Sequence, residues 1–489
     1  MQTTRLVKTI IILGICLASL IVATFLNGDA PNVSAGKVTV AGSQTIYLPL
    51  VLNQTFSQPS STTRRVNAPY FDGAIWYGGA SIFWFGKVTP TENYADVRVA
   101  YNATDLYVRV TVFDRRIWCN TNPQANDPTV WDAVTLYFNT NGNSGNTPST
   151  SAYRLVSQFG AGVNCTNGAW ASAYRGNGTS WVATNFSFST DSWYRGDAGP
   201  NQDADNKGWV ITFRIPFASL GMSSPPPQGN TWGLGITLHD RDDSAGTPIA
   251  SKPWPETLVS DRPSTWGQLV FGLPSAYVAP PATPRSTVTI RHGLNGAVVT
   301  DGEVGGDTTC GAGLDHWPQW GEKNYVGQPQ INIQNQEDVS DWPCFSKYYV
   351  TFPLTALPSG KVVISSTLTM HLFGNSGQGW NPGPYRSLIQ ALTLNEDWNE
   401  STLTWNNAPL AAEYVDETYV DPLDTVPPWP GIAYTWNASS AVAKAYAAGR
   451  PLRLVLYSAD NPMHSGKYFY SSDADPEGRP MLQVLWGDP

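Results

Sequence analysis

Tryptophans in polar, Pro- or Gly-rich loops are the first residues that could bind a ligand. A tryptophan in such a loop keeps one flat indole face open to water, whereas elsewhere the ring packs in the core. Pyranose sugars offer flat C–H faces to such rings, and their hydroxyls bond to neighbouring polar side chains. The loop tryptophans are Trp118, Trp131, Trp170, Trp181, Trp254, Trp317, Trp320, Trp380 and Trp429. We expect at least one to contact sugar; core packing is the alternative for each.

Two acidic clusters offer oxygen ligands. Asp203 and Asp205 lie in NQDADN, and Asp240 and Asp242 lie in HDRDDS. Closely spaced aspartates on loops can surround Ca²⁺, although neither cluster has the spacing of an EF-hand. A solvated turn is the favoured interpretation and no cofactor is expected; structural calcium is the alternative.

Sequence motifs of catalysis are missing. None of the five histidines stands in HExxH, and the sequence has no GxSxG, no GxxxxGK[ST] and no GxGxxG after a strand. The two carboxylates of a glycoside hydrolase need not be close in sequence, so an enzyme acting on carbohydrate stays an alternative. We expect a non-catalytic protein.

The amino terminus predicts export. Arg5 and Lys8 precede an apolar run from Ile10 to Leu26, and Val33-Ser34-Ala35 is a cleavage pattern, so residues 1–35 read as a signal peptide. An uncleaved anchor is the alternative, because the run reaches the lower limit for a membrane span. We expect a secreted or cell-surface protein with no membrane contact after cleavage, and the cell envelope as a further partner.

Four cysteines follow the predicted signal peptide. An even number in an exported chain suggests disulfides, and four cysteines allow three pairings. Cys119–Cys165 and Cys310–Cys344 are expected, because each pair then lies inside one half of the chain. Zinc is the competing interpretation, but no CxxC pair exists.

Composition narrows the class of protein. The chain has 489 residues with 14% charged residues, 20 Trp and 38 Pro, which excludes coiled coils and helical bundles. The net charge is −9 and no basic block occurs, so nucleic acid is not an expected partner. Residues 286–489 alone carry a net charge of −11, which favours neutral ligands or contacts bridged by calcium.

Two β-sandwich domains are predicted. Residues 36–64 form a polar segment that contains an apolar island, Ile46–Leu52, whose role is unexplained. The Pro-rich stretch 276–285 divides the rest of the chain into residues 65–275 and 286–489. Apolar and polar residues alternate with period two in both halves, which is typical of half-buried strands. The segments with this pattern are 97–101, 106–112, 134–138, 209–215, 348–352, 367–372, 388–392, 452–457 and 481–485, and 438–448 alone has helical character.

The first half resembles the family 9 carbohydrate-binding modules, which belong to the DOMON-like β-sandwiches. The resemblance rests on YADVRVAYNATDLYVRVTVFDR, WDAVTLYFNTNG, GWVITFRIPFASLG, GNTWGLGITLHDRDD and WGQLVF, in this order. Such modules hold sugar between two tryptophans, with charged residues binding the hydroxyls.

That resemblance implies particular binding residues. Trp131 and Trp254 match the two ring positions, and Asp114, Asp132 and Arg154 match the charged ones. Thr135 and Thr237 depart from the pattern, because they stand where an acidic residue and an amide are expected. Some DOMON-like domains bind haem through Met and His; Met222 and His239 are the residues of those types in this half, and a loop methionine with a solvent histidine is the favoured interpretation.

The second half resembles the DNRLRE-type domain, which is related to family 96 carbohydrate-binding modules. The match rests on KYYVTFPLTALP, SSTLTMHLF, EDWNESTLTWNNAP and KYFYSSDADPEGRPML. In such domains the tryptophans of the WNESTLTWNNAP segment, Trp398 and Trp405, are packed. Together the two resemblances and the loop tryptophans, Trp317, Trp320 and Trp380 among them, predict a secreted protein that captures poly- or oligosaccharide. A structural or adhesive surface protein with sandwich domains as spacers is the main alternative.

Overall fold

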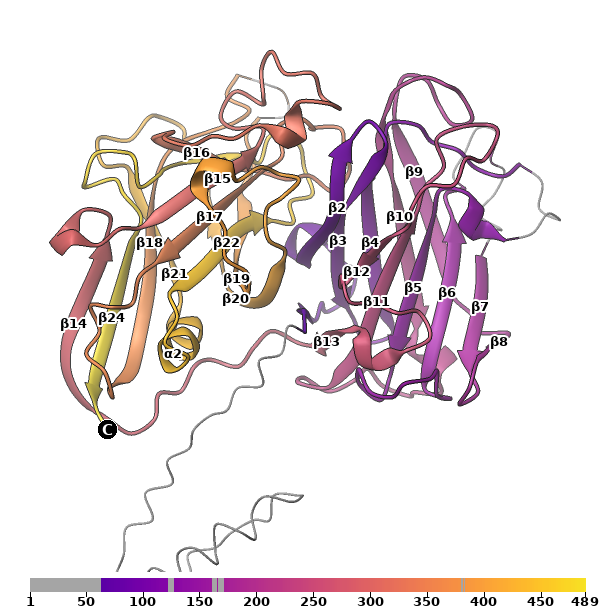
Figure 1. Cartoon of the computed structure of the whole chain (residues 1–489), viewed down its shortest axis with the longest axis horizontal. Coiled ribbons are helices and arrows are strands. Elements are labelled where there is room, and N and C mark those ends of the chain that lie inside the picture. Colours follow the sequence, from indigo (N-terminus) through magenta and orange to yellow (C-terminus); the bar gives the residue numbers. More distant parts are fainter. Residues whose placement is uncertain (1–62, 122–126, 161–164, 166–170, 380, 382) are drawn as a thin grey trace, which may run out of the picture. The chain divides into compact units, whose positions relative to one another are not determined.

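The structure is a computed structural model that describes residues 63–489 except 122–126, 161–164, 166–170, 380 and 382. The predicted signal peptide, the apolar island Ile46–Leu52, Trp170 and Trp380 lie outside the described residues. The described chain is almost entirely β-structure (Figure 1). Its α-helix is α2 (Ser439–Ala447), where helix was predicted. The 3-10 turns are η1 (Tyr77–Gly79), η2 (Pro128–Val130), η3 (Phe217–Leu220), η4 (Pro263–Thr265), η5 (Leu294–Gly296), η6 (Trp320–Glu322) and η7 (Glu400–Thr402).

Two sheets form from residues 65–271. The eight-stranded sheet contains, in order, β1 (Arg65–Ala68), β13 (Gly267–Phe271), β11 (Thr231–His239), β5 (Ala133–Asn139), β6 (Ala152–Gln158), β7 (Ala171–Gly176) and β8 (Trp181–Ala183), with β12 (Lys252–Trp254) on β11. The five-stranded sheet contains β2 (Ser81–Thr89), β3 (Glu92–Tyr101), β4 (Asp105–Phe113), β10 (Asn206–Pro216) and β9 (Ser189–Gly196). All pairings are antiparallel except β1 with β13.

Period-two alternation explains how these sheets pack. On β5, Val134, Leu136 and Phe138 are buried in one apolar core with residues of the facing five-stranded sheet, such as Val97 and Ile211. Successive side chains of a strand point to opposite faces, so the residues between them lie on the outer face. The predicted β-sandwich is therefore confirmed for this half.

Two more sheets form from residues 283–488. The six-stranded sheet contains β14 (Thr283–Arg291), β24 (Met481–Asp488), β18 (Val362–Asn375), β23 (Lys467–Tyr470) and β16 (Gln330–Ile333), with β21 (Ile432–Asn437) on β18. The five-stranded sheet contains β15 (Thr300–Gly305), β17 (Ser346–Phe352), β22 (Leu452–Ser458), β19 (Ser387–Leu394) and β20 (Ala411–Val420). Their inner faces enclose a second apolar core. β14 begins at Thr283, two residues before the predicted end of the linker.

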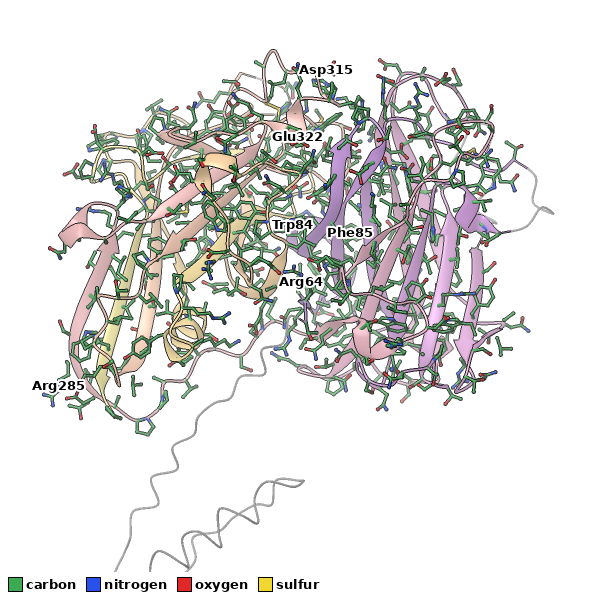
Figure 2. All side chains as sticks on the ribbon, in the orientation of Figure 1. Arg64, Trp84, Phe85, Arg285, Asp315 and Glu322 are labelled. Atoms are coloured by element: carbon green, nitrogen blue, oxygen red, sulfur yellow. A yellow bond between two sulfur atoms is a disulfide. The ribbon has the colours of Figure 1, made fainter. Side chains whose placement is uncertain are left out.

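A third apolar core joins residues of both halves. Trp84 on β2 and Phe113 on β4 pack with Trp320, Trp342 and Trp405 from the second half. Figure 2 labels Trp84 beside Phe85 on β2. Neighbouring residues of a strand face opposite ways, so Phe85 packs in the first core and Trp84 packs in the third. The sequence did not predict this shared core.

Buried polar contacts accompany the shared core. The Arg98 guanidinium is fully buried and donates to the backbone oxygens of Ala459 and Gln336. The buried Lys347 ammonium lies 3.3 Å from the centre of the Trp405 ring and also donates to the Tyr94 hydroxyl. Unpaired buried polar groups are costly, so these contacts fix one arrangement of the residues around the third core.

Both predicted disulfides are present. Cys119 pairs with Cys165, and Cys310 pairs with Cys344. The zinc interpretation of the cysteines is therefore wrong. Among the described residues, helices are too short or too polar to pass through a lipid bilayer.

Candidate functional site

A pocket of about 380 Å³ lies on the outer face of the eight-stranded sheet. This volume falls within the range of small-ligand sites, roughly 300–1,000 Å³. Strands β5, β6, β7 and β11 and the turn before β5 supply its lining. The lining residues are Asp127, Pro128, Thr129, Thr135, Tyr137, Arg154, Val156, Ser172, Tyr174 and His239.

Strand alternation places these side chains together. Thr135 and Tyr137 occupy the outer positions of β5, between the buried core residues, and Thr135 is paired in register with Val156 of β6. Arg154 is in turn opposite Tyr174 of β7. The register therefore brings polar and aromatic groups from three adjacent strands onto one patch.

Arg154 is the strongest hydrogen-bond donor of the pocket. Its guanidinium carbon lies 4.0 Å from the centre of the Tyr174 ring and 5.6 Å from that of Trp181. Its Nε atom is buried and has no hydrogen-bond partner among the described residues. A buried donor without an acceptor costs free energy, and an oxygen atom of a ligand would satisfy it.

His239 closes the β11 side of the pocket. Its Nε2 lies 2.8 Å from Thr135 Oγ1, and its Nδ1 lies 3.1 Å from Ser251 Oγ. Burial lowers the pKa of His239 to about 4, so the imidazole is neutral at pH 7. In the neutral ring one nitrogen donates and the other accepts, and these two nitrogens bond to Thr135 and Ser251. Of the two residues of haem-ligand type, Met222 packs against the first core and His239 lines the pocket.

An aromatic cluster lies beside Arg154. The Trp181 and Trp266 rings are parallel within 4°, with centres 6.3 Å apart, and Tyr137 packs against both. Trp181 is partly exposed, and its indole N–H donates to Asp261 at 2.7 Å. The position of its ring is thereby fixed next to the Arg154 guanidinium.

Three carboxylates meet near the same edge of the sheet. Asp114 follows β4 and Asp240 and Asp242 follow β11, and one carboxylate oxygen from each lies within 4.8 Å of the others. Both oxygens of Asp240 are buried, and neither has a hydrogen-bond partner in the part of the chain that the structure describes. Burial and the neighbouring carboxylates raise the pKa of Asp114 and Asp240 well above the ordinary range, and burial raises that of Asp242 to about 6.

This donor set fits a hard divalent cation. Calcium prefers carboxylate oxygens, and an ion would bind the two buried Asp240 oxygens that have no hydrogen-bond partner among the described residues. Asp132 is buried beside the cluster, where it accepts hydrogen bonds from the backbone N–H groups of Trp118 and Arg241. Its pKa is raised by burial and by Asp114 and Asp240.

Several predicted binding residues are not exposed. Trp254 is 1% exposed and packs against Phe83, with ring centres 4.1 Å apart. Trp320 is fully buried and Trp317 is 6% exposed, both in the shared core. The prediction that these rings are open to solvent is therefore wrong. Trp254 packs into the core of its own half, whereas Trp317 and Trp320 pack in the core to which the first half contributes residues.

Trp317 lies beside polar residues in a second hollow. It lines a second, shallower hollow of about 310 Å³ together with Lys207, His316 and Trp342. Lys207 donates to the backbone oxygens of Ser340 and Trp342. Since both indoles are buried, the hollow offers little area for stacking.

Other predicted residues have different partners from those expected. Asp114 is fully buried and accepts from the Trp209 indole at 2.8 Å, so like Asp132 it lies below the surface. Trp131 is partly exposed, lies 3.9 Å under the Arg241 guanidinium and does not line the pocket.

The acidic clusters are regrouped by the fold. Asp203 forms an ion pair with Arg116, and Asp205 forms one with Arg115 at 2.8 Å. Among the described residues these two aspartates belong to no group of three potential metal ligands, whereas Asp240 and Asp242 join Asp114. The predicted metal site therefore keeps two of its four residues.

The sequence predicted Arg154 as a binding residue but not most of the residues that line the pocket with it. Tyr137, Ser172, Tyr174 and His239 were not predicted as binding residues. A sequence pattern could have indicated these residues, because the outward positions of their strands hold polar and aromatic residues instead of the usual charged ones. The strand pairing that joins them is not visible in one sequence.

A second acidic group lies in the other half of the chain. Asp301, Glu400 and Asp473 approach one another, but Asp301 already accepts hydrogen bonds from Ser472 and Tyr348. The buried member is therefore satisfied by the protein itself.

Comparison with known proteins relates the second half to a family. Residues 318–485 match the model of carbohydrate-binding module family 96. This match confirms the resemblance predicted from WNESTLTWNNAP and its neighbours, and it supports a carbohydrate-binding role for that part of the chain. No curated protein matches the chain.

Solved structures returned for the chain include family 9 modules. One, from Caldicellulosiruptor kristjanssonii in complex with glucose, shares 15% identity, covers 44% of this chain and all of its own, and has a TM-score of 0.30. A module from the same organism in complex with cellotriose shares 16% identity, covers 45% of this chain and all of its own, and also has a TM-score of 0.30.

Proposed function

We propose that this protein is a secreted, non-catalytic carbohydrate-binding protein that holds a neutral oligosaccharide in the pocket around Arg154. The observation that carries the proposal is Arg154, which lines the pocket and whose buried Nε has no hydrogen-bond acceptor among the described residues. Sugar hydroxyls supply acceptors of this kind, and the neighbouring tyrosines offer apolar surface for the ring. A net charge of −9 favours a neutral ligand over a polyanion.

Binding in this pocket is expected to be weak. A small sugar buries little apolar area, and each hydroxyl gives up water when it enters. A Kd between about 10 μM and 1 mM is the expected range.

We also propose that Asp114, Asp240 and Asp242 hold a structural Ca²⁺. Asp240 directly follows His239, and Asp114 accepts from the core indole of Trp209, so the ion would connect the rim of the pocket to the interior. Its contribution is to neutralise the carboxylates and fix the loop after β11.

The test is isothermal titration of neutral gluco-, xylo- and manno-oligosaccharides against the full chain. We expect measurable binding to at least one series and a loss of about tenfold or more for Arg154→Met, which keeps the apolar stem and removes the donors. Arg175→Met is the matched control, because Arg175 is an exposed arginine on the neighbouring strand β7, outside the pocket lining. Equal binding by wild type and Arg154→Met would contradict the pocket assignment.

A further inference from the structure

Partly exposed aromatic rings form a row on the outer face of the six-stranded sheet in the second half. Phe373 on β18 stacks with Tyr470 on β23, with ring centres 4.5 Å apart and planes 26° from parallel. Tyr468 lies 6.2 Å from Phe373 on one side, and Trp429 lies 4.8 Å from Tyr470 on the other. We call Trp429, Tyr470, Phe373 and Tyr468 the aromatic strip.

The strip does not belong to the core. Leu372 and Phe469 point inward from the same strands and are fully buried, so Phe373, Tyr468 and Tyr470 occupy the opposite face. Trp429 comes from the loop between β20 and β21 and is 46% exposed. Such a large exposed ring beside other aromatics is unusual on a soluble domain and marks an interaction surface.

Glycines let two of the rings lie against backbone. A Cβ atom at Gly478 would come within 2.6 Å of the Trp429 ring, and one at Gly374 within 3.0 Å of the Tyr468 ring. One side of each ring is therefore supported, which keeps its orientation fixed. Rigid aromatic platforms lose little conformational entropy when a ligand binds.

Polar groups suited to hydroxyls flank the strip. Gln330 is exposed and is paired in register with Tyr470, so its amide lies on the same face. Asp475 and Glu477 are exposed in the turn that contains Gly478, and neither has an ion-pair partner in the part of the chain that the structure describes. These carboxylates accept hydrogen bonds and repel anionic ligands.

We propose that the aromatic strip is a second glycan-binding face, which takes a neutral polysaccharide chain through stacking on Trp429, whose ring Tyr470 contacts at 62° between the ring planes. Charge selects the occupant, because the strip is flanked by free carboxylates in a half of the chain with a net charge of −11. An apolar protein partner would leave Asp475 and Glu477 desolvated without partners. The inference rests on the carbohydrate-binding role proposed above, but not on the pocket around Arg154.

The experiment is affinity electrophoresis of the full chain in native gels that contain a soluble β-1,4-glucan, β-1,3-glucan, mannan or alginate. Wild type is expected to be retarded by at least one neutral polymer and not by alginate. Trp429→Ala and Tyr470→Ala are expected to weaken this retardation about fivefold, and Trp429→Tyr to retain most of it. Tyr419→Ala is the control, since Tyr419 is 40% exposed but lies on β20 of the other sheet.

Combination with Arg154→Met separates the two proposals. Residual retardation in Arg154→Met that disappears when Trp429→Ala is added supports the strip. Loss of all retardation in Arg154→Met with no effect of Trp429→Ala overturns the strip and leaves the pocket. Loss of all retardation in Trp429→Ala, with no effect of Arg154→Met, overturns the pocket and leaves the strip. Retardation by alginate overturns the neutral occupant, and no retardation by any polymer overturns the strip. Unchanged melting temperatures of the variants confirm that they are folded.

Discussion

The Arg154 guanidinium lies 4.0 Å from the centre of the Tyr174 ring, and both side chains line the pocket on the outer face of the eight-stranded sheet. The ring covers one face of the guanidinium and leaves its edge, which carries the N–H groups, free to donate. Arginine stacked in this way is preorganised, so less rotamer entropy is lost when it binds an acceptor.

This relationship predicts unequal effects of two substitutions at Tyr174. Tyr174→Ala removes the cation–π contact, which is worth about 0.5–2 kcal/mol, and should weaken oligosaccharide binding about 2- to 30-fold. Tyr174→Phe keeps the ring and should bind within about twofold of wild type unless the hydroxyl itself contacts sugar. Titration calorimetry of both variants checks this; equal losses in the two would show that the ring face is not what positions Arg154.

The calcium proposal predicts stabilisation by Ca²⁺. Protein stripped with a chelator should melt at a lower temperature than protein in excess Ca²⁺, and saturation at 100 times Kd would contribute about 2.7 kcal/mol. Asp240→Asn should abolish the Ca²⁺-dependent shift, because it removes a buried ligand whose oxygens have no other partner.

Asp203→Asn is the matched control for that experiment. Asp203 was predicted as a ligand from the sequence, but it is exposed and paired with Arg116. We expect this variant to keep the full Ca²⁺ shift in differential scanning fluorimetry. A shift that depends on Asp203 and not on Asp240 would favour the grouping predicted from sequence over the one in the structure.

Glu303 predicts a pH dependence of stability. Burial raises the pKa of Glu303 in the folded chain to about 8, from about 4.5 when exposed. The folded state thus holds a proton that the unfolded state releases, so this residue makes the free energy of unfolding fall as the pH rises from about 4.5 to 8. Glu303→Gln imitates the protonated form and should be more stable than wild type at pH 8.5 by at least about 1 kcal/mol, with a small difference at pH 4.5.

Urea unfolding of both proteins at the two pH values measures this difference. Asp424→Asn is the control, because Asp424 is an exposed carboxylate with no contact to the buried group. A constant difference between Glu303→Gln and wild type at pH 4.5 and 8.5 would show that folding does not raise the pKa of Glu303.

The shared third core predicts that both halves unfold together. Trp405→Ala removes a ring that packs against Tyr94 and Trp320 and should cost about 3–5 kcal/mol. Lys347→Met keeps a side chain of similar volume and removes only the buried ammonium, so it should cost less than about 1.5 kcal/mol. Differential scanning calorimetry should give one transition for wild type and Lys347→Met; two well-separated transitions in wild type would mean that the core does not couple the halves.

Much of the fold was predictable because strand alternation is a local property of sequence. The β5 pattern of Val134, Leu136 and Phe138 places the inner face without any knowledge of its partner, and all nine predicted strands are present. The disulfide pairing followed from keeping each pair within one half.

The site was less predictable because exposure depends on contacts made far along the chain. Trp254 stands in a loop-like Pro-rich segment, yet that segment forms β12, and its ring packs on Phe83. Asp240 belongs to a group of three possible metal ligands only because it lies near Asp114, which is 126 residues earlier in the chain. The resemblance to family 9 named Arg154, which lines the pocket, whereas the tyrosines around it are brought there by strand register.

The central claim is most directly tested by a crystal structure of the full chain soaked with the best-binding neutral oligosaccharide. We expect a sugar oxygen within hydrogen-bonding distance of the Arg154 guanidinium and a pyranose ring in the pocket beside Tyr137 and Tyr174. Clear density for sugar elsewhere, with the Arg154 pocket filled only by water at saturating ligand, would contradict it.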